Sequence, residues 1–303
     1  MSAERVAAAP RDLRGPGLAV ASGVLFGVVV IAGKPALGGD LPFTLLTWRF
    51  AGTCLALTVF ALATRRPLRL ARGEGVPILA AGFFGYGVEA SLFWAALNHG
   101  SAAAVTLLFY TYPVSTMLIA MATGRLPQGG ALWLALAAAM GGVLVLVAGG
   151  QDIDIEAAGV VLALACSLAY TLYLTVTDHA LRRSNPLTAG IWLSGAAATF
   201  CLVAATVTRT FDVPSGWEGW RPIAVMALCT AGAFACMLAA IKRIGAVRTA
   251  IIGVFEPLSV AVLGAIWLDE PLTFTVVAGG LLILVAAVLA TRVRGERVVE
   301  PDL

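Results

Sequence analysis

The chain has 303 residues, of which 60% are hydrophobic and only 12% are charged, and its mean hydropathy is +0.93. Soluble proteins carry about 25% charged residues, so this composition excludes an ordinary soluble domain and indicates a lipid environment. The formal net charge of +3 comes from basic residues spread between apolar stretches, so we expect membrane lipid and no nucleic acid as a partner.

Ten stretches of roughly 20 residues carry little or no charge, which is the length that crosses about 30 Å of hydrocarbon as a helix. None alternates with a period of two, so a β-barrel is not expected. The sequence therefore predicts an all-α polytopic membrane protein with ten transmembrane helices and tails at 1–16 and 292–303. The predicted helices cover residues 17–36, 41–63, 76–97, 102–123, 130–148, 157–178, 187–208, 222–241, 247–268 and 273–291.

The basic residues fall on one side of these helices. Sixteen of the 20 Lys and Arg residues lie in the N-terminal tail and in every second segment between or after the predicted helices. Three lie in the remaining segments, and Arg49 lies inside a helix. Cytoplasmic loops are enriched in Lys and Arg. We therefore expect both termini to be cytoplasmic.

The two halves of the sequence repeat each other. A shift of 144 residues places Pro42-x-Thr44-x-x-x-Trp48 on Pro186-x-Thr188-x-x-x-Trp192, and it also places Pro113 on Pro257. Residues 17–148 and 157–291 thus form two repeats of five helices each. Because five is odd, the second repeat enters the membrane from the other side, as in the inverted repeats of secondary transporters.

Several segments resemble one family of membrane proteins. They are "LFGVVVIAGKPAL", "LTWRFAG", "LFWAALNHGSAAAVTLLFYTYPVSTMLIAM" and "FEPLSVAVLGAIWLDEPLT". In this order and spacing they are similar to the EamA-type drug/metabolite transporter superfamily, and the last is similar to bacterial exporters of amino acids such as threonine and homoserine. The resemblance implies a secondary transporter in the bacterial inner membrane that exports amino acids or related small metabolites.

Glu256 is the first candidate for a functional residue. A charged side chain inside a membrane helix costs about +2.5 to +3.5 kcal/mol on insertion scales, so it is a functional candidate by default. Glu256 lies near the middle of its helix, and its repeat-mate is Tyr112; Pro257 and Pro113 follow them directly. Proline removes a helical hydrogen bond, so we expect two kinks that open a central cavity. Glu256 then binds a substrate ammonium or couples export to protons, or else it only hydrogen-bonds a neighbouring helix.

Three further charges lie within or at the ends of helices. Arg49 and Glu89 are each eight residues from the same end of sequential helices, which suggests an ion pair with a structural or gating role, the alternative being direct substrate contact. Lys34 lies near the end of the first helix, where it either reaches an anionic substrate group or extends to the interface.

Tyrosines form the last group of candidates. Tyr110 and Tyr112 flank the first kink, whereas Tyr86 and Phe93 lie three residues before and four after Glu89, on one helix face. Aromatic rings suit aromatic or cationic solutes. The alternative is ordinary packing against lipid or other helices.

Other functional classes find less support. The sequence has two histidines and no H-E-x-x-H, G-x-S-x-G or Walker motif, so an integral membrane enzyme is disfavoured and no metal or cofactor is expected. The five cysteines all fall inside predicted helices without a C-x-x-C pair, which is typical of small apolar residues. A channel and a lipid scramblase remain open alternatives to a carrier of small-molecule substrates.

Overall fold

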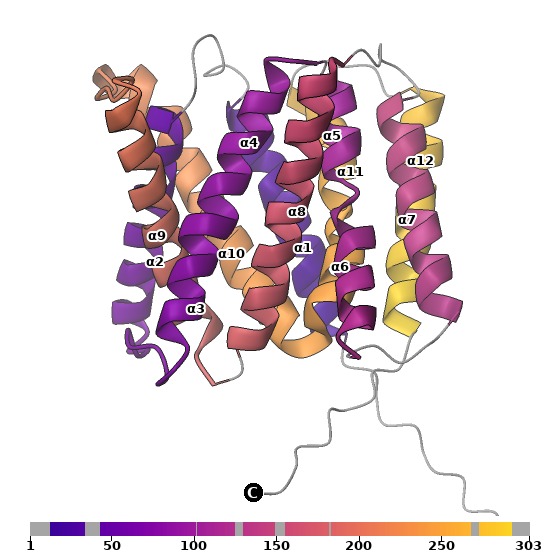
Figure 1. The fold of residues 1–303 in the computed structure, drawn as a ribbon, viewed down its shortest axis with the longest axis horizontal. Helices are drawn as coiled ribbons and strands as arrows, with labels where there is room; N and C mark the ends of the chain where they lie inside the picture. Colours follow the sequence, from indigo (N-terminus) through magenta and orange to yellow (C-terminus); the bar gives the residue numbers. More distant parts are fainter. Residues whose placement is uncertain are drawn as a thin grey trace, which may run out of the picture.

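The structure is a computed structural model that describes residues 13–33, 43–100, 102–124, 130–148, 155–181, 183–267 and 273–292. The helices stand side by side in one layered bundle (Figure 1). They are α1 (Arg14–Gly33), α2 (Phe43–Ala63), α3 (Gly75–Ala80), the π-helix η2 (Ala81–Gly87), α4 (Val88–Leu97), α5 (Ala102–Phe109), α6 (Tyr112–Ala122), α7 (Gly130–Ala148), α8 (Ala157–Ala180), α9 (Pro186–Val207), α10 (Gly216–Gly253), α11 (Phe255–Trp267) and α12 (Phe274–Arg292).

Within the described ranges these segments group into ten spans, which confirms the predicted fold class. Segments α3, η2 and α4 run on as one span, and α5 continues into α6. Helix α10 changes direction at Gly245, which has a φ of 79°, so its last part and α11 together form the ninth span. Seven of the described helices are long and apolar enough to cross a membrane, and the shorter apolar helices include Phe255–Trp267.

Two details differ from the sequence prediction. Helix α10 begins at Gly216, before the predicted residue 222. Residues 81–87 of the third span form a π-helix, which the apolar pattern does not indicate. Single turns of π-helix are frequent at functional sites because they change which side chains share a face. The predicted site residue Lys34 lies outside the described residues.

Helix packing follows the repeat. Under the 144-residue shift α1 corresponds to α8, α2 to α9 and α7 to α12. Helix α1 packs on α10 and α11, and α8 packs on the corresponding spans, η2 with α4 and α5 with α6. Helix α2 packs on its own mate α9, and α7 packs on α12. Exchanging the repeats maps each of these contacts onto another of them, so the two halves are related by an approximate two-fold axis.

The repeated threonine and tryptophan explain part of this packing. Trp48 Nε1 donates to the carbonyl of Asp212 at 3.0 Å, and Trp192 Nε1 donates to the carbonyl of Leu68 at 2.9 Å. Thr44 and Thr188 donate in the same way to the carbonyls of Thr210 and Pro67. Each repeat therefore anchors the loop that follows the second helix of the other repeat.

The two ends of the bundle differ in charge. The α2–α3 loop, residues 64–74, lies where α2 ends and carries four arginines; we call this the basic end. We call the other end, where α1 and α4 finish, the acidic end, because Glu156, Asp212 and Glu218 lie there. The four arginines are Arg65, Arg66, Arg69 and Arg72.

Candidate functional site

A cavity of about 280 Å³ lies between the two repeats. It extends from Glu256, at the start of α11, to Gly33 and Leu97, the last residues of α1 and α4. It therefore reaches the acidic end of the bundle. Helices α1, α2, α4, α5, α8, α10 and α11 and the π-helix η2 contribute to its walls, so its shape depends on how both repeats are placed.

The polar wall of this cavity holds three of the predicted charged residues, because Arg49, Glu89 and Glu256 all line it. Two carboxyl groups and one guanidinium thus share one space inside an apolar bundle. Charges in such a place are expensive unless they contact one another, water or a ligand. The arrangement suits a solute that carries both an ammonium and a carboxylate.

Glu256 owes its position to a break in its span. Helix α10 ends at Gly253 and α11 begins at Phe255, so the carboxylate projects from the first turn of a new helix. The break precedes Pro257, as the missing amide hydrogen predicts. Gly23 of α1 is close to this turn: a Cβ atom there would lie 3.1 Å from the Glu256 nitrogen. Tyr110 is buried near this carboxylate.

Arg49 does not form the predicted ion pair with Glu89 within 4.0 Å in the described structure. Its Nε donates to Thr230 Oγ1 at 2.9 Å, and its Nη2 lies 3.5 Å from the Tyr86 hydroxyl. Its guanidinium also lies 5.0 Å from the centroid of the Phe50 ring. The direct pair was wrong because hydroxyl groups on α10 and η2 take up these donors, although Arg49 and Glu89 line the same cavity.

Glu89 is buried, with 9% of its surface exposed. Cys166 of α8 lies against it, with its Sγ 3.4 Å from the Glu89 carbonyl oxygen and 3.8 Å from Oε1. The helix face predicted to carry Tyr86, Glu89 and Phe93 also lies on this wall, since all three residues line the cavity. Aromatic and acidic groups therefore alternate along one face of the third span.

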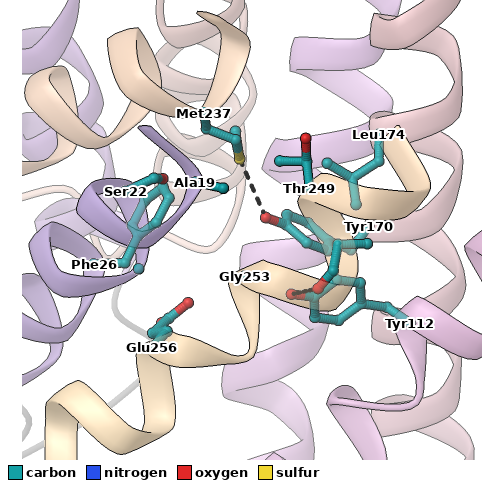
Figure 2. Close-up of a pocket in the computed structure, with 12 residues that line it drawn as sticks. Ala19, Ser22, Phe26, Tyr112, Tyr170, Leu174, Met237, Thr249, Gly253 and Glu256 are labelled. Carbon is teal, nitrogen blue, oxygen red and sulfur yellow. Dashed lines mark hydrogen bonds between the residues drawn. The ribbon is translucent and has the colours of Figure 1, made fainter. Parts of the chain in front are cut away.

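A second pocket begins where the cavity ends. It holds about 20 Å³, enough for roughly one water molecule. Phe26, Tyr170 and Glu256 line both spaces, so they mark the boundary between them. Figure 2 shows Glu256 on one side of the small pocket and the rings of Tyr112 and Tyr170 on the other. The path beyond Glu256 toward the basic end is thus nearly closed.

Tyr112 helps to close that path. Its hydroxyl donates to the carbonyl of Ala250 at 3.4 Å, and a Cβ atom on Gly253 would lie 3.0 Å from the hydroxyl oxygen. Tyr170 lies beside it, with its hydroxyl 3.5 Å from the sulfur of Met237. Tyr110 is buried next to Glu256 but lines neither space.

The break before Pro113 is the repeat counterpart of the break before Pro257. Helix α5 ends at Phe109 and α6 begins at Tyr112. Helix α8 supports this first break: Ser167 Oγ lies 3.0 Å from Thr111 Oγ1, and Thr171 Oγ1 donates to the Tyr112 carbonyl at 3.3 Å. The predicted kinks therefore lie at matching positions of the two repeats.

Sequence reasoning missed some residues of the cavity. Thr230, the main partner of Arg49, is a lone threonine in the apolar run "ALCTAGAF". The signal that leads to it is the repeat itself, because Tyr86 shifted by 144 falls on Thr230. Phe26 was not singled out either, although the same shift places it on Tyr170. Among the described residues no group of three His, Cys, Asp or Glu side chains is placed to hold a metal ion.

Comparison with known proteins agrees with the repeat. The family model of the EamA-like transporter family matches residues 13–148 and again residues 157–292. The second match begins 157 − 13 = 144 residues after the first, which is the shift found in the sequence. One solved crystal structure is similar over 91% of this chain and 96% of the other, with a TM-score of 0.78 and 19% sequence identity. No curated protein matches the sequence significantly.

Proposed function

Because this chain belongs to the EamA-like transporter family, we propose that it is a secondary carrier that exports amino acids or related small metabolites by alternating access. The observation that carries the proposal is the cavity that ends at Glu256. It is wide toward the acidic end and nearly closed toward the basic end. A carrier requires such a site, which is accessible from one face at a time.

The charges of the cavity support an amino acid as the substrate. Arg49 offers a guanidinium to a carboxylate, and Glu89 and Glu256 offer carboxylates to an ammonium. A zwitterionic amino acid satisfies both kinds of group. The rings of Phe93 and Phe109 supply apolar walls for a side chain. A neutral sugar would offer these three charged groups no opposite charge, so it is disfavoured.

Glu256 is the proposed coupling residue. It lies at the boundary between the open and the closed space, so a change of access would expose it to each face in turn. A carboxyl group in that position can bind a proton from one side and release it on the other. Export of an amino acid in exchange for a proton then needs no nucleotide-binding domain.

We place the protein in the bacterial cytoplasmic membrane with the basic end in the cytoplasm. The excess of Lys and Arg on that side supports this orientation. The cavity then faces the outside of the cell in this structure. Both terminal tails, 1–16 and 292–303, would be cytoplasmic.

Transport by the purified protein in proteoliposomes tests the proposal. Radiolabelled amino acids are screened one at a time with an imposed pH gradient of either sign. We expect saturable uptake of a few amino acids, stimulated by the gradient and by unlabelled substrate on the opposite side. Rapid flux that does not saturate would instead indicate a channel, and movement of labelled phospholipid alone would indicate a scramblase.

A further inference from the structure

The repeat relates the open cavity to the small closed pocket. Shifting cavity residues by 144 leads to residues of the pocket: Glu256 is the mate of Tyr112, and Phe26 is the mate of Tyr170. Further matches have one member on the cavity and the other on the pocket. These are Val30 with Leu174, Thr106 with Ala250, and Phe109 with Gly253. The small pocket is therefore the collapsed counterpart of the cavity.

Two cavity residues of α1 have mates that lie deeper toward the basic end. Val29 corresponds to Tyr173, and Gly33 corresponds to Thr177. Both mates are fully buried on α8, at 0% exposure. Together with Tyr170 they occupy positions i, i+3 and i+7, which lie on one face of a helix. This face of α8 runs along the helix from the level of Glu256 toward the basic end.

Both of these buried residues carry a hydroxyl without a partner. Among the described residues the Tyr173 hydroxyl and Thr177 Oγ1 have no hydrogen bond. A buried polar group left unpaired costs about 1–3 kcal/mol. Hydration of the two hydroxyl groups in another state of the transport cycle would account for this cost.

Resting on the carrier function proposed above, we infer that the substrate path at the basic end follows this face of α8. Tyr173 and Thr177 line the path once the site opens to that end, and their hydroxyl groups then contact water and the polar groups of the passing amino acid. Leu174, already on the pocket wall in Figure 2, lies on the same face.

Thr175 provides a matched control on the same helix. Its hydroxyl is also buried without a partner among the described residues. However, Thr175 lies on another face of α8, and its mate Ile31 does not line the cavity. Nothing in the structure explains the unpaired hydroxyl of Thr175. The path inference predicts that Thr175 stays inaccessible.

Cysteine accessibility tests the inference. Thr177→Cys, Thr175→Cys and Val29→Cys are each made in the full chain and treated with a membrane-impermeant methanethiosulfonate, from the basic end or the acidic end in oriented vesicles. Modified peptides are identified by mass spectrometry, with the buried native Cys166 as internal reference. We expect T177C to react at least tenfold faster from the basic end, V29C at least tenfold faster from the acidic end, and T175C from neither.

A second measurement separates a path from simple loosening of α8. Tyr173→Phe removes the unpaired hydroxyl that favours opening, so it should lower T177C modification from the basic end several-fold. Should T177C fail to fold, Leu174→Cys serves in its place. Equal modification of T177C and T175C, or no change with Tyr173→Phe, would overturn the inference.

The outcomes also separate this inference from the proposed function. If saturable transport persists while T177C and L174C both stay unreactive from the basic end, the α8 path is wrong and the carrier stands. If V29C and T177C both react from one side at the same rate, the pore is open throughout and both conclusions fall.

Discussion

The two helix breaks sit at equivalent positions, yet they are held in different ways. At the first break, Ser167 and Thr171 of α8 reach the chain beside Tyr112 through hydroxyl groups. At the second break the equivalent positions of α1 are Gly23 and Gly27, since 167 − 144 = 23 and 171 − 144 = 27. A Cβ atom on Gly27 would lie 2.8 Å from Ser259 Cβ, so no side chain fits there.

This difference indicates that the first break is fixed and that the second break is able to shift. Hydrogen bonds across α8 fix the first break in place, where Tyr112 blocks the path. Glycine contacts across α1 bring two backbones together without side-chain hydrogen bonds, which allows one surface to shift over the other. The carboxylate of Glu256 is found at the second break. The proposed coupling carboxylate therefore lies at the break that we expect to move.

The largest expected effect is that of Glu256→Gln. Glutamine keeps the shape but cannot carry a charge or release a proton, so transport driven by a pH gradient should fall more than tenfold and lose its dependence on pH. Uptake in proteoliposomes measures this, with Glu156→Gln at the exposed acidic end as the control. Normal export by the variant at every external pH would remove Glu256 from the mechanism.

Gly27→Ala tests the close approach at the second break. The added methyl group meets Ser259 and its backbone, so we expect a loss of about 1–3 kcal/mol in stability, the usual cost of overpacking. Thermal unfolding in detergent measures it. Gly17→Ala on the same helix, which has nothing within 4 Å of the new Cβ, should unfold like the parent protein. Equal stability of the two variants would contradict a tight α1–α11 contact.

The variant Glu74→Gln tests whether the hydrogen bonds of Glu74 help to keep the basic end closed. This buried carboxylate accepts hydrogen bonds from the backbone nitrogens of Arg183 and Ser184, both at 2.8 Å, while Lys242 Nζ donates to the Ser184 carbonyl. Glu74→Gln loses the charge and one acceptor, so we expect a loss of about 1 kcal/mol and faster labelling of T177C from the basic end. Its repeat-mate Glu218, exposed at the acidic end, supplies the control Glu218→Gln.

Acid should weaken the same hydrogen bonds between the Glu74 carboxylate and the backbone of Arg183 and Ser184. Burial alone would raise the pKa of Glu74, but hydrogen bonds from Ser184 and from the backbone of Arg183 and Ser184, with the charge of Lys242, outweigh it and lower that pKa. A lowered folded-state pKa means that the contribution to stability is complete above the ordinary carboxyl range. It is lost as the pH falls through the lowered value. Between pH 6 and pH 8 the parent and Glu74→Gln should therefore differ by a constant amount in thermal unfolding; a difference that changes across this window would contradict the lowered pKa.

The smallest effect is expected from Thr171→Val at the first break. It removes one hydroxyl donor to the Tyr112 carbonyl, and such bonds between membrane helices contribute about 0.6 kcal/mol on average. Unfolding and transport should both change slightly. Thr199→Val, which loses only a bond within its own exposed helix turn, is the comparison. An effect larger than that of Gly27→Ala would reverse the assignment of the fixed and the movable break.

The sequence predicted the spans and the repeat well because both depend on local physics. Twenty apolar residues form a helix in lipid whatever their neighbours are, and the Pro-Thr-Trp spacing recurs because each copy binds a loop of the other repeat. Glu256 and its proline were likewise visible, since a charge inside an apolar run stands out in any register.

Partners across the bundle were less predictable. Equal depth on neighbouring helices suggested that Arg49 meets Glu89, but the direction of a long side chain depends on which hydroxyl groups surround it, and Thr230 lies 181 residues away. The π-helix at 81–87 has no signature that distinguishes it from an ordinary glycine-rich helix. Glu74 was missed because its partners are backbone nitrogens, which every sequence possesses.

The crossed tryptophan bonds have a consequence for how the molecule assembles. Trp48 finds its acceptor only after residue 212 has been made, and the acceptor of Trp192 belongs to the first half. A protein cut between α7 and α8 would leave each fragment with an indole donor and no carbonyl to receive it. Neither fragment is then expected to persist by itself in the cell, whereas the two produced together should find each other and restore the whole.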